Sequence, residues 1–379
     1  MKIENAAANA LVCISILPSV VGIILALIGI RSFVAITAYG ITLFFLLQLR
    51  GKKTRLNFGV WSVLLYLFFF LFSMTYTISK VASEIKFAAI LLNILLPISY
   101  LIIVFKHKIC LDKLEAKYFE KVNKFAGVFS IVLVLMLLVG LTEKGDDFEG
   151  RDTIIGMANA IWSSRLAGFL ALFPIISFFR NGKMKRIEVV GLISAIYIMI
   201  RSASRGPILS LVVSLILVLF PKVKMRYKII TVIMLIVFYN AFLYFSPRTF
   251  YGGISDSTGR KGLVEYVLDS KFDETTIIRG FGIGSFQLAF FDEDVYHYPH
   301  NIFVETFTET GLIGISFFIL FLVALFRRRK NSSLFSTICL YFFINSQFSG
   351  DIAGNNYFFI FATVILLSSN ICHKQLVYK

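Results

Sequence analysis

Long apolar runs alternate with short polar connections along the 379 residues of the chain. A helix of roughly 20 apolar residues crosses the hydrocarbon core of a bilayer, and about twelve runs approach that length. They lie near residues 11–30, 32–48, 57–76, 85–105, 125–141, 159–179, 187–203, 207–220, 229–246, 301–326, 333–349 and 355–371. The pattern predicts an all-α polytopic membrane protein with about 12 transmembrane helices, in which residues 1–379 form a single integral membrane domain.

The composition excludes a single water-soluble domain. Hydrophobic residues make up 58% of the chain and charged residues 16%, with a mean hydropathy of +0.81. A soluble domain carries about 25% charged residues. The formal net charge of +16 would suggest a nucleic-acid partner in a soluble protein, so its position relative to the membrane has to be considered first.

Cytoplasmic loops of membrane proteins carry an excess of Lys and Arg, and this rule orients the chain. With the N-terminus inside, 25 of the 38 basic residues fall on the cytoplasmic side against five acidic residues, a balance of +20. The outer segments hold 12 basic and 15 acidic residues, a balance of −3. We therefore expect both termini in the cytoplasm and no nucleic-acid partner, because the positive charge follows from topology.

The longest polar segment, residues 247–300, precedes the tenth apolar run on the outer side. It is too long for a simple connector, which indicates that it carries part of a functional site. Its glycine cluster, Gly280 to Gly284, follows no strand and opens no nucleotide-binding helix, so it is not a dinucleotide motif. We expect these glycines to allow close backbone packing or a bend.

Arginines at the outer face need a reason, because ionisable side chains at membrane depth are costly. Arg165 lies inside an apolar run, where snorkelling to the interface is one explanation. Arg201 and Arg205 flank a tight turn, where pairing with outer acids is the corresponding alternative. Gly206 and Pro207 are typical of a helix start, whose free N–H groups favour an anion. Together with the planar fork of Arg205, they predict recognition of a lipid-linked phosphate.

Candidate acid–base residues gather at the start of the run 301–326. His297 and His300 are the two histidines expected outside, and an imidazole can take a proton from a sugar hydroxyl near neutral pH. Glu305 and Glu309 are spaced to share one helix face with Asn301, although carboxylates there also simply stabilise a helix N-terminus. A structural hydrogen-bonding role is the alternative for His300. The nearby acids at 292–294 have metal-like spacing, but solvated acids are the simpler interpretation, and no metal or other cofactor is expected.

Three segments resemble the O-antigen polymerase (Wzy-type) and O-antigen ligase (WaaL-type) superfamily. They are Arg201-Ser202-Ala203-Ser204-Arg205-Gly206-Pro207, Gly280-Phe281-Gly282-Ile283-Gly284-Ser285-Phe286, and Tyr298-Pro299-His300-Asn301 followed by Glu305, Glu309 and Gly311-Leu312-Ile313-Gly314. The resemblance spans roughly residues 150–320 in the family's order. It implies a bacterial inner-membrane glycosyltransferase of GT-C-like architecture, with its active site in the periplasm. The donor would be an undecaprenyl-diphosphate-linked oligosaccharide, used in an inverting, metal-independent reaction.

The resemblance also implies roles for individual residues. Arginines would bind the donor diphosphate, with Arg205 as the best match. The other candidates are Arg165, Arg201, Arg260 and Arg279. His300 would act as the base beside the acceptor hydroxyl, oriented by Glu305 or Asn301, with Glu309 and His297 as further acceptor-side or orienting residues.

The sequences of these motifs resemble those of polymerases more closely. Polymerases join two lipid-linked repeat units of an O-antigen or capsule. A ligase, which transfers the glycan to lipid A core during lipopolysaccharide biosynthesis, is the alternative. A lesser alternative is a transporter of lipid-linked glycan without catalytic activity. Expected partners are membrane lipids, a chain-length regulator and a flippase.

Overall fold

The computed structural model describes residues 2–16, 18–20, 23, 57–105, 109–144, 152–154, 160–202, 204–219, 267, 272–296, 298–328 and 334–368. These residues are mainly helical, with one short antiparallel strand pair, β1 (Thr142–Lys144) and β2 (Asp152–Ile154). In this part of the chain, five helical segments are long and apolar enough to cross a membrane: Phe58–Tyr76, Val81–Val104, Leu111–Leu138, Ala160–Asn181 and Ile302–Arg328. The prediction of a helical chain with membrane-spanning helices is confirmed at this level.

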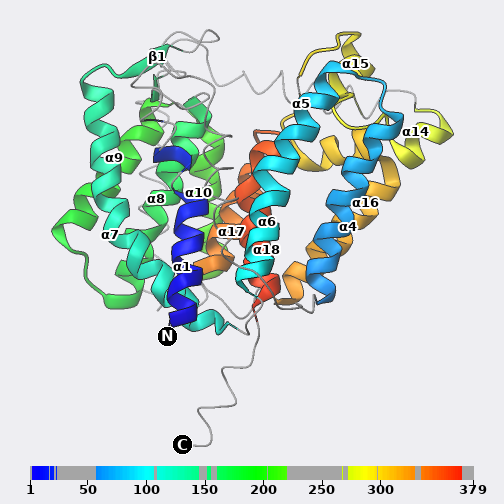
Figure 1. The fold of residues 1–379 in the computed structure, drawn as a ribbon. Coiled ribbons are helices and arrows are strands. Elements are labelled where there is room, and N and C mark those ends of the chain that lie inside the picture. The colour runs from blue at the N-terminus through cyan, green and yellow to red at the C-terminus, as the bar shows by residue number, and fades with distance from the viewer. Residues whose placement is uncertain are drawn as a thin grey trace, which may run out of the picture. The chain divides into compact units, whose positions relative to one another are not determined.

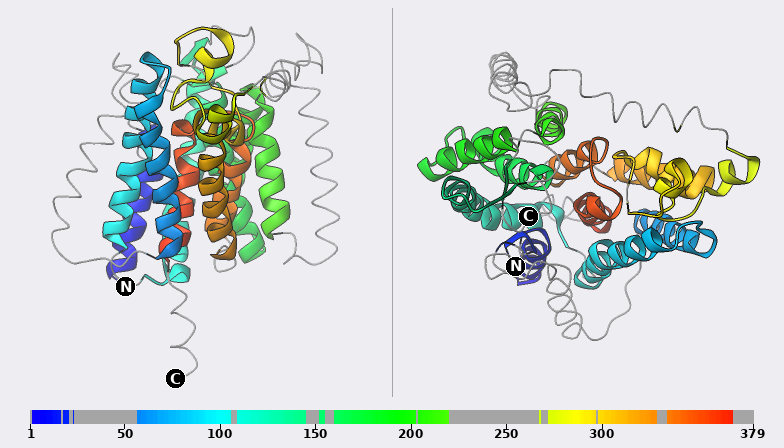
Figure 2. Two further views of the ribbon diagram at one scale, coloured as in Figure 1. Left: turned by 90° about the vertical axis from the view of Figure 1, so that its right-hand side faces the viewer. Right: turned by 90° about the horizontal axis from the view of Figure 1, so that it is seen from above.

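The chain divides into two compact units, each built from two separate stretches of sequence. The first unit comprises Met1–Ala38 and Leu114–Asp256, and the second comprises Tyr39–Lys113 and Ser257–Lys379. Within each unit most of the long helices run roughly parallel or antiparallel to one another (Figure 1). Two further views show the same arrangement (Figure 2).

The first unit is a helical bundle. Its described helices are α1 (Lys2–Ser15), most of α7 (Leu111–Leu138), α8 (Ala160–Asn181), α9 (Arg186–Arg201) and α10 (Arg205–Leu219). Small residues let two of them approach closely, since a Cβ atom added to Gly191 of α9 would lie 2.5 Å from the Cα atom of Gly127 in α7. At one end of the bundle, Arg180 pairs with Glu115. These contacts fix α7, α8 and α9 relative to one another.

The second unit contains the segments that bear the predicted acid–base residues. Its described helices are α4 (Phe58–Phe72), α5 (Val81–Ile90), α6 (Leu96–Val104), α14 (Glu274–Arg279), α15 (Phe286–Phe291), α16 (Ile302–Arg328), α17 (Leu334–Asn345) and α18 (Asn356–Leu367). A π-helical turn, Leu91–Leu95, joins α5 to α6. α4 and α16 lie side by side (Figure 1), and the buried Tyr66 hydroxyl of α4 hydrogen-bonds the Thr306 hydroxyl of α16 at 2.9 Å.

α16 is broken at Gly311, which has a φ of 59°. A break in a membrane helix leaves carbonyl groups without their usual partners, and these need other donors. The glycine cluster supplies them: the N–H of Phe281 donates to the Thr308 carbonyl and the N–H of Gly282 donates to the Glu309 carbonyl, each at 2.9 Å. The expectation that these glycines allow close packing is confirmed, because a Cβ on Gly280 would lie 2.4 Å from the Glu309 carbonyl carbon.

Most predicted apolar runs in the described residues coincide with helices, but two helix starts were wrong. α1 begins at Lys2, whereas the first apolar run began at 11. α7 begins at Leu111, whereas the apolar run began at 125, because its first turns are amphipathic and hydropathy detects only the apolar remainder. The predicted spans 32–48 and 229–246 lie outside the described residues. So does most of the long outer segment 247–300, whose described part is residue 267 together with residues 272–296 and 298–300.

Candidate functional site

His300 lies at the start of α16 in a conformation that few residues adopt. Its φ of 60° makes it one of two non-glycine residues with positive φ in the described chain, the other being Asp292. Asn301 follows and caps α16, because its side-chain oxygen accepts hydrogen bonds from the N–H groups of Phe303 at 2.9 Å and Val304 at 3.2 Å. The Tyr298 ring and the imidazole pack in a T-shaped arrangement, with 4.7 Å between their centroids. The imidazole is therefore held at a defined helix start.

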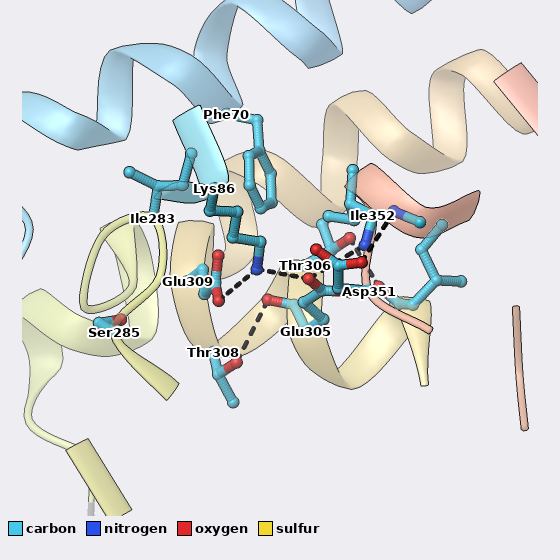
Figure 3. Close-up of polar contacts among 12 residues, drawn as sticks. Phe70, Lys86, Ile283, Ser285, Glu305, Thr306, Thr308, Glu309, Asp351 and Ile352 are labelled. Atoms are coloured by element: carbon cyan, nitrogen blue, oxygen red, sulfur yellow. Dashed lines mark hydrogen bonds and ion pairs between the residues drawn. The ribbon is translucent and has the colours of Figure 1, made fainter. Parts of the chain in front are cut away.

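Glu305 and Glu309 do not face solvent as free capping carboxylates. Both are fully buried and both pair with Lys86 of α5, which is itself 1% exposed. The Lys86 Nζ atom lies 2.6 Å from Oε1 of Glu309 and also contacts Oε1 of Glu305. Figure 3 shows the ammonium between the two carboxylates, with the ring of Phe70 beside it. A buried charge is stable only when paired, so the three residues form one electrostatic unit.

Asp351 extends this unit to the segment between α17 and α18. Its carboxylate lies beside Lys86 and Glu305 (Figure 3) and accepts a hydrogen bond from the Tyr296 hydroxyl. Burial and the neighbouring Asp351 raise the pKa of the Tyr296 phenol well above its usual range, so the hydroxyl remains a donor. The N–H of Ile352 donates to Oε1 of Glu305 at 3.1 Å. We call Lys86, Glu305, Glu309, Asp351 and Tyr296 the Lys86 cluster.

The acidic segment at 292–294 has a structural role through one of its members. Asp294 accepts hydrogen bonds from the Ser79 hydroxyl and from the N–H groups of Lys80 at 3.1 Å and Val81 at 3.3 Å, at the start of α5. The bond from Ser79 holds the pKa of the Asp294 carboxyl below its usual range. In the described part of the chain, no group of three or more His, Cys, Asp or Glu side chains is arranged to hold a metal ion.

The candidate diphosphate ligands of the first unit lie toward one end of its helices. α8 and α9 pack as an antiparallel pair and α10 follows α9 after residues 202–204, so Arg165, Arg201 and Arg205 share that end. Arg165 is 3% exposed, with its guanidinium carbon 5.2 Å from the centre of the Trp162 ring. Arg201 is exposed at the end of α9.

Arg205 is distinguished by its donors. As the first residue of α10, it buries Nε and Nη2, and neither atom has a hydrogen-bond partner among the described residues. The buried hydroxyl of Ser202, just before it, also has no partner there. Nε and Nη2 form the edge of a guanidinium that binds two oxygens of one anion side by side. This end of the first unit therefore offers unused donors at a helix N-terminus.

Three further predicted residues complete the set. Arg279 ends α14 in the second unit, where its guanidinium carbon lies 5.1 Å from the centre of the Tyr76 ring. Arg260 and His297 lie outside the described residues. His300 and Asn301 directly precede α16 and Glu305 and Glu309 lie on it, so the structure brings these four residues to one stretch of the second unit. Sequence reasoning missed Lys86, Tyr296 and Asp351. Lys86 could have been noticed as an ionisable residue at the start of an apolar run.

No protein-family model matches the chain, and a search of curated proteins gives no match either. A function for the chain therefore has to follow from its own residues and their geometry.

Proposed function

We propose that the chain is a polysaccharide polymerase that joins undecaprenyl-diphosphate-linked oligosaccharide repeat units at the outer face of a bacterial inner membrane. The observation that carries the proposal is the pair of buried donors on Arg205, Nε and Nη2 at the start of α10, which have no hydrogen-bond partner among the described residues. Buried donors cost free energy unless an acceptor completes them, and an anion is the acceptor that suits a guanidinium. A diphosphate on a membrane lipid has the charge and the adjacent oxygens that this edge can bind.

The proposal includes the finer architecture expected from the sequence. The chain would have about twelve spans, both termini in the cytoplasm, and a long periplasmic segment over residues 247–300. Its arrangement would be GT-C-like, with a flippase delivering the donor and a chain-length regulator limiting the product. The resemblance of the segments around Arg205, Gly282 and His300 to the Wzy-type and WaaL-type superfamily supports this placement.

The proposed reaction divides the work between arginines and His300. The acceptor hydroxyl oxygen forms a bond to the anomeric carbon while the bond from that carbon to the diphosphate oxygen breaks, with inversion. His300 takes the proton of the hydroxyl, and guanidinium groups stabilise the negative charge that develops on the diphosphate. No metal is needed in this scheme, so polymer formation should persist in a chelator.

Full-length protein in lipid nanodiscs, supplied with lipid-linked repeat units, tests the role of His300. We expect wild type to give a ladder of polymers, and His300→Asn to lose about 10²- to 10⁴-fold in rate. Asn is the sharper substitution because it tolerates positive φ, so the start of α16 is preserved. A full ladder from His300→Asn would remove the assigned base.

Arg205→Lys tests the diphosphate edge, because it keeps the charge and loses the paired N–H groups. We expect a rate loss on the order of 10²-fold. Arg186→Lys is the matched control, since Arg186 is exposed at the start of α9, and it should retain normal activity. Equal activities of the two variants would contradict bidentate binding at Arg205.

The same assay separates the polymerase from the ligase alternative. Wild type is offered lipid-linked repeat units alone and then together with lipid A core. Longer lipid-linked chains in the first reaction indicate a polymerase. Glycan that appears only on lipid A core indicates a ligase. If neither product forms, both activities are refuted.

A further inference from the structure

The backbone of His300 has a conformation that needs support from its surroundings. A non-glycine residue with a φ of 60° lies in a sparsely populated region and persists only where neighbouring contacts determine it. Asn301 caps α16 but lies on the helical side of His300. The support therefore has to come from contacts on both sides of the histidine.

Such contacts are present upstream and downstream. Upstream, the Tyr296 hydroxyl donates to Asp351. Downstream, the N–H of Ile302 donates to the Ser346 carbonyl at 3.0 Å, and Glu305 accepts from Ile352 at 3.1 Å. Both sides of His300 are thus tied to the single segment that joins α17 to α18.

Lys86, on α5, adds a further part of the chain to this arrangement. It pairs with Glu305 and Glu309 on α16, and the Asp351 carboxylate lies beside it (Figure 3). Three buried carboxylates this close repel one another, and the ammonium offsets that repulsion. Without it, Glu305 and Asp351 would be pushed apart, and with them the two anchors of His300.

We propose that the Lys86 cluster is a positioning site that fixes the His300 imidazole at the start of α16. The bonds of Tyr296 and Asp351 and of Glu305 and Ile352 reach the chain on either side of His300, so the cluster acts through that backbone. The catalytic importance of this positioning rests on the proposed function. The claim that the Lys86 cluster orients His300 does not depend on it.

The test compares full-length variants in lipid nanodiscs by two readouts. Tyr296→Phe removes a single hydroxyl, and the double variant Lys86→Met with Glu309→Gln removes one positive and one negative charge together. Tyr118→Phe is the matched control, because it removes a hydroxyl that bonds Ser15 at 2.8 Å in the other unit. The readouts are the NMR signal of ¹⁵N-labelled His300, assigned by its loss in His300→Asn, and the polymerase kcat and KM.

We expect the His300 signal to shift or broaden in Tyr296→Phe and in the double variant, and to stay as in wild type in Tyr118→Phe. A misplaced catalytic group should lower kcat by about 10- to 100-fold, with KM within about 2-fold because the donor contacts remain. A merely structural cluster would lower the amount of folded protein without this split.

An unchanged His300 signal in Tyr296→Phe overturns the proposal, even if the double variant does not fold. If wild type is active, an unchanged kcat in Tyr296→Phe overturns the proposal as well. A wild type without polymerase or ligase activity refutes the proposed function instead, and the NMR comparison still decides whether the cluster positions His300.

Discussion

At the scale of single residues, Lys86 balances the buried negative charge of the second unit. It is the cation that pairs with both Glu305 and Glu309, all three being nearly or fully buried. Lys86→Met leaves two buried carboxylates without their partner, which should cost about 3–5 kcal/mol in the free energy of unfolding. The measurement is reversible unfolding in mixed micelles. Adding Glu309→Gln should recover part of the loss, because one unpaired charge is then removed.

Lys117→Met is the control for this prediction. Lys117 pairs with Glu120 at 3.4 Å, but both side chains are exposed, at 41% and 53%. Exposed ion pairs contribute about 0–1 kcal/mol, so this variant should unfold almost as wild type does. Equal losses for Lys86→Met and Lys117→Met would show that the buried cluster contributes nothing particular to stability.

At the scale of elements, the broken helix α16 depends on close approach by the glycine cluster. Gly282 has a φ of 94°, and a Cβ atom there would lie 2.3 Å from the Cα atom of Thr77. Gly140 has a similar φ of 77° but no heavy atom within 4 Å of an added Cβ. Gly140→Ala should therefore cost only the backbone strain, about 1–2 kcal/mol. Gly282→Ala should cost a further 1–3 kcal/mol, roughly, for the overlap. Equal unfolding free energies for the two variants would contradict the close contact.

These elements also show what the sequence could and could not predict. Apolar runs located α4, α8, α16 and their neighbours because length and hydrophobicity suffice to mark a span. The break at Gly311 was not predicted, since hydropathy contains no information on backbone dihedrals.

The ion-pair partner of Glu309 was not predicted either. Lys86 lies 223 residues away, and only the packing of α5 against the start of α16 reveals the pair. The turn and the helix start at Arg205 were read from the sequence, and α10 does begin there, but its role in binding an anion stays a prediction.

At the scale of the whole molecule, the proposed function requires the His300 segment to lie outside, and the charge bias predicts this orientation. The predicted inner segments total +20 and the outer segments −3, a bias that places Lys183 inside and Glu293 outside. Both side chains are exposed, Lys183 between α8 and α9 and Glu293 after α15, so cysteines there should react readily. In spheroplasts of a strain whose protein lacks its native cysteines, a membrane-impermeant maleimide should label Glu293→Cys at once. It should label Lys183→Cys only after detergent opens the membrane. The opposite pattern would place His300 in the cytoplasm and exclude the proposed reaction at the outer face. Early labelling at both sites would indicate that the two units do not follow one charge-determined topology.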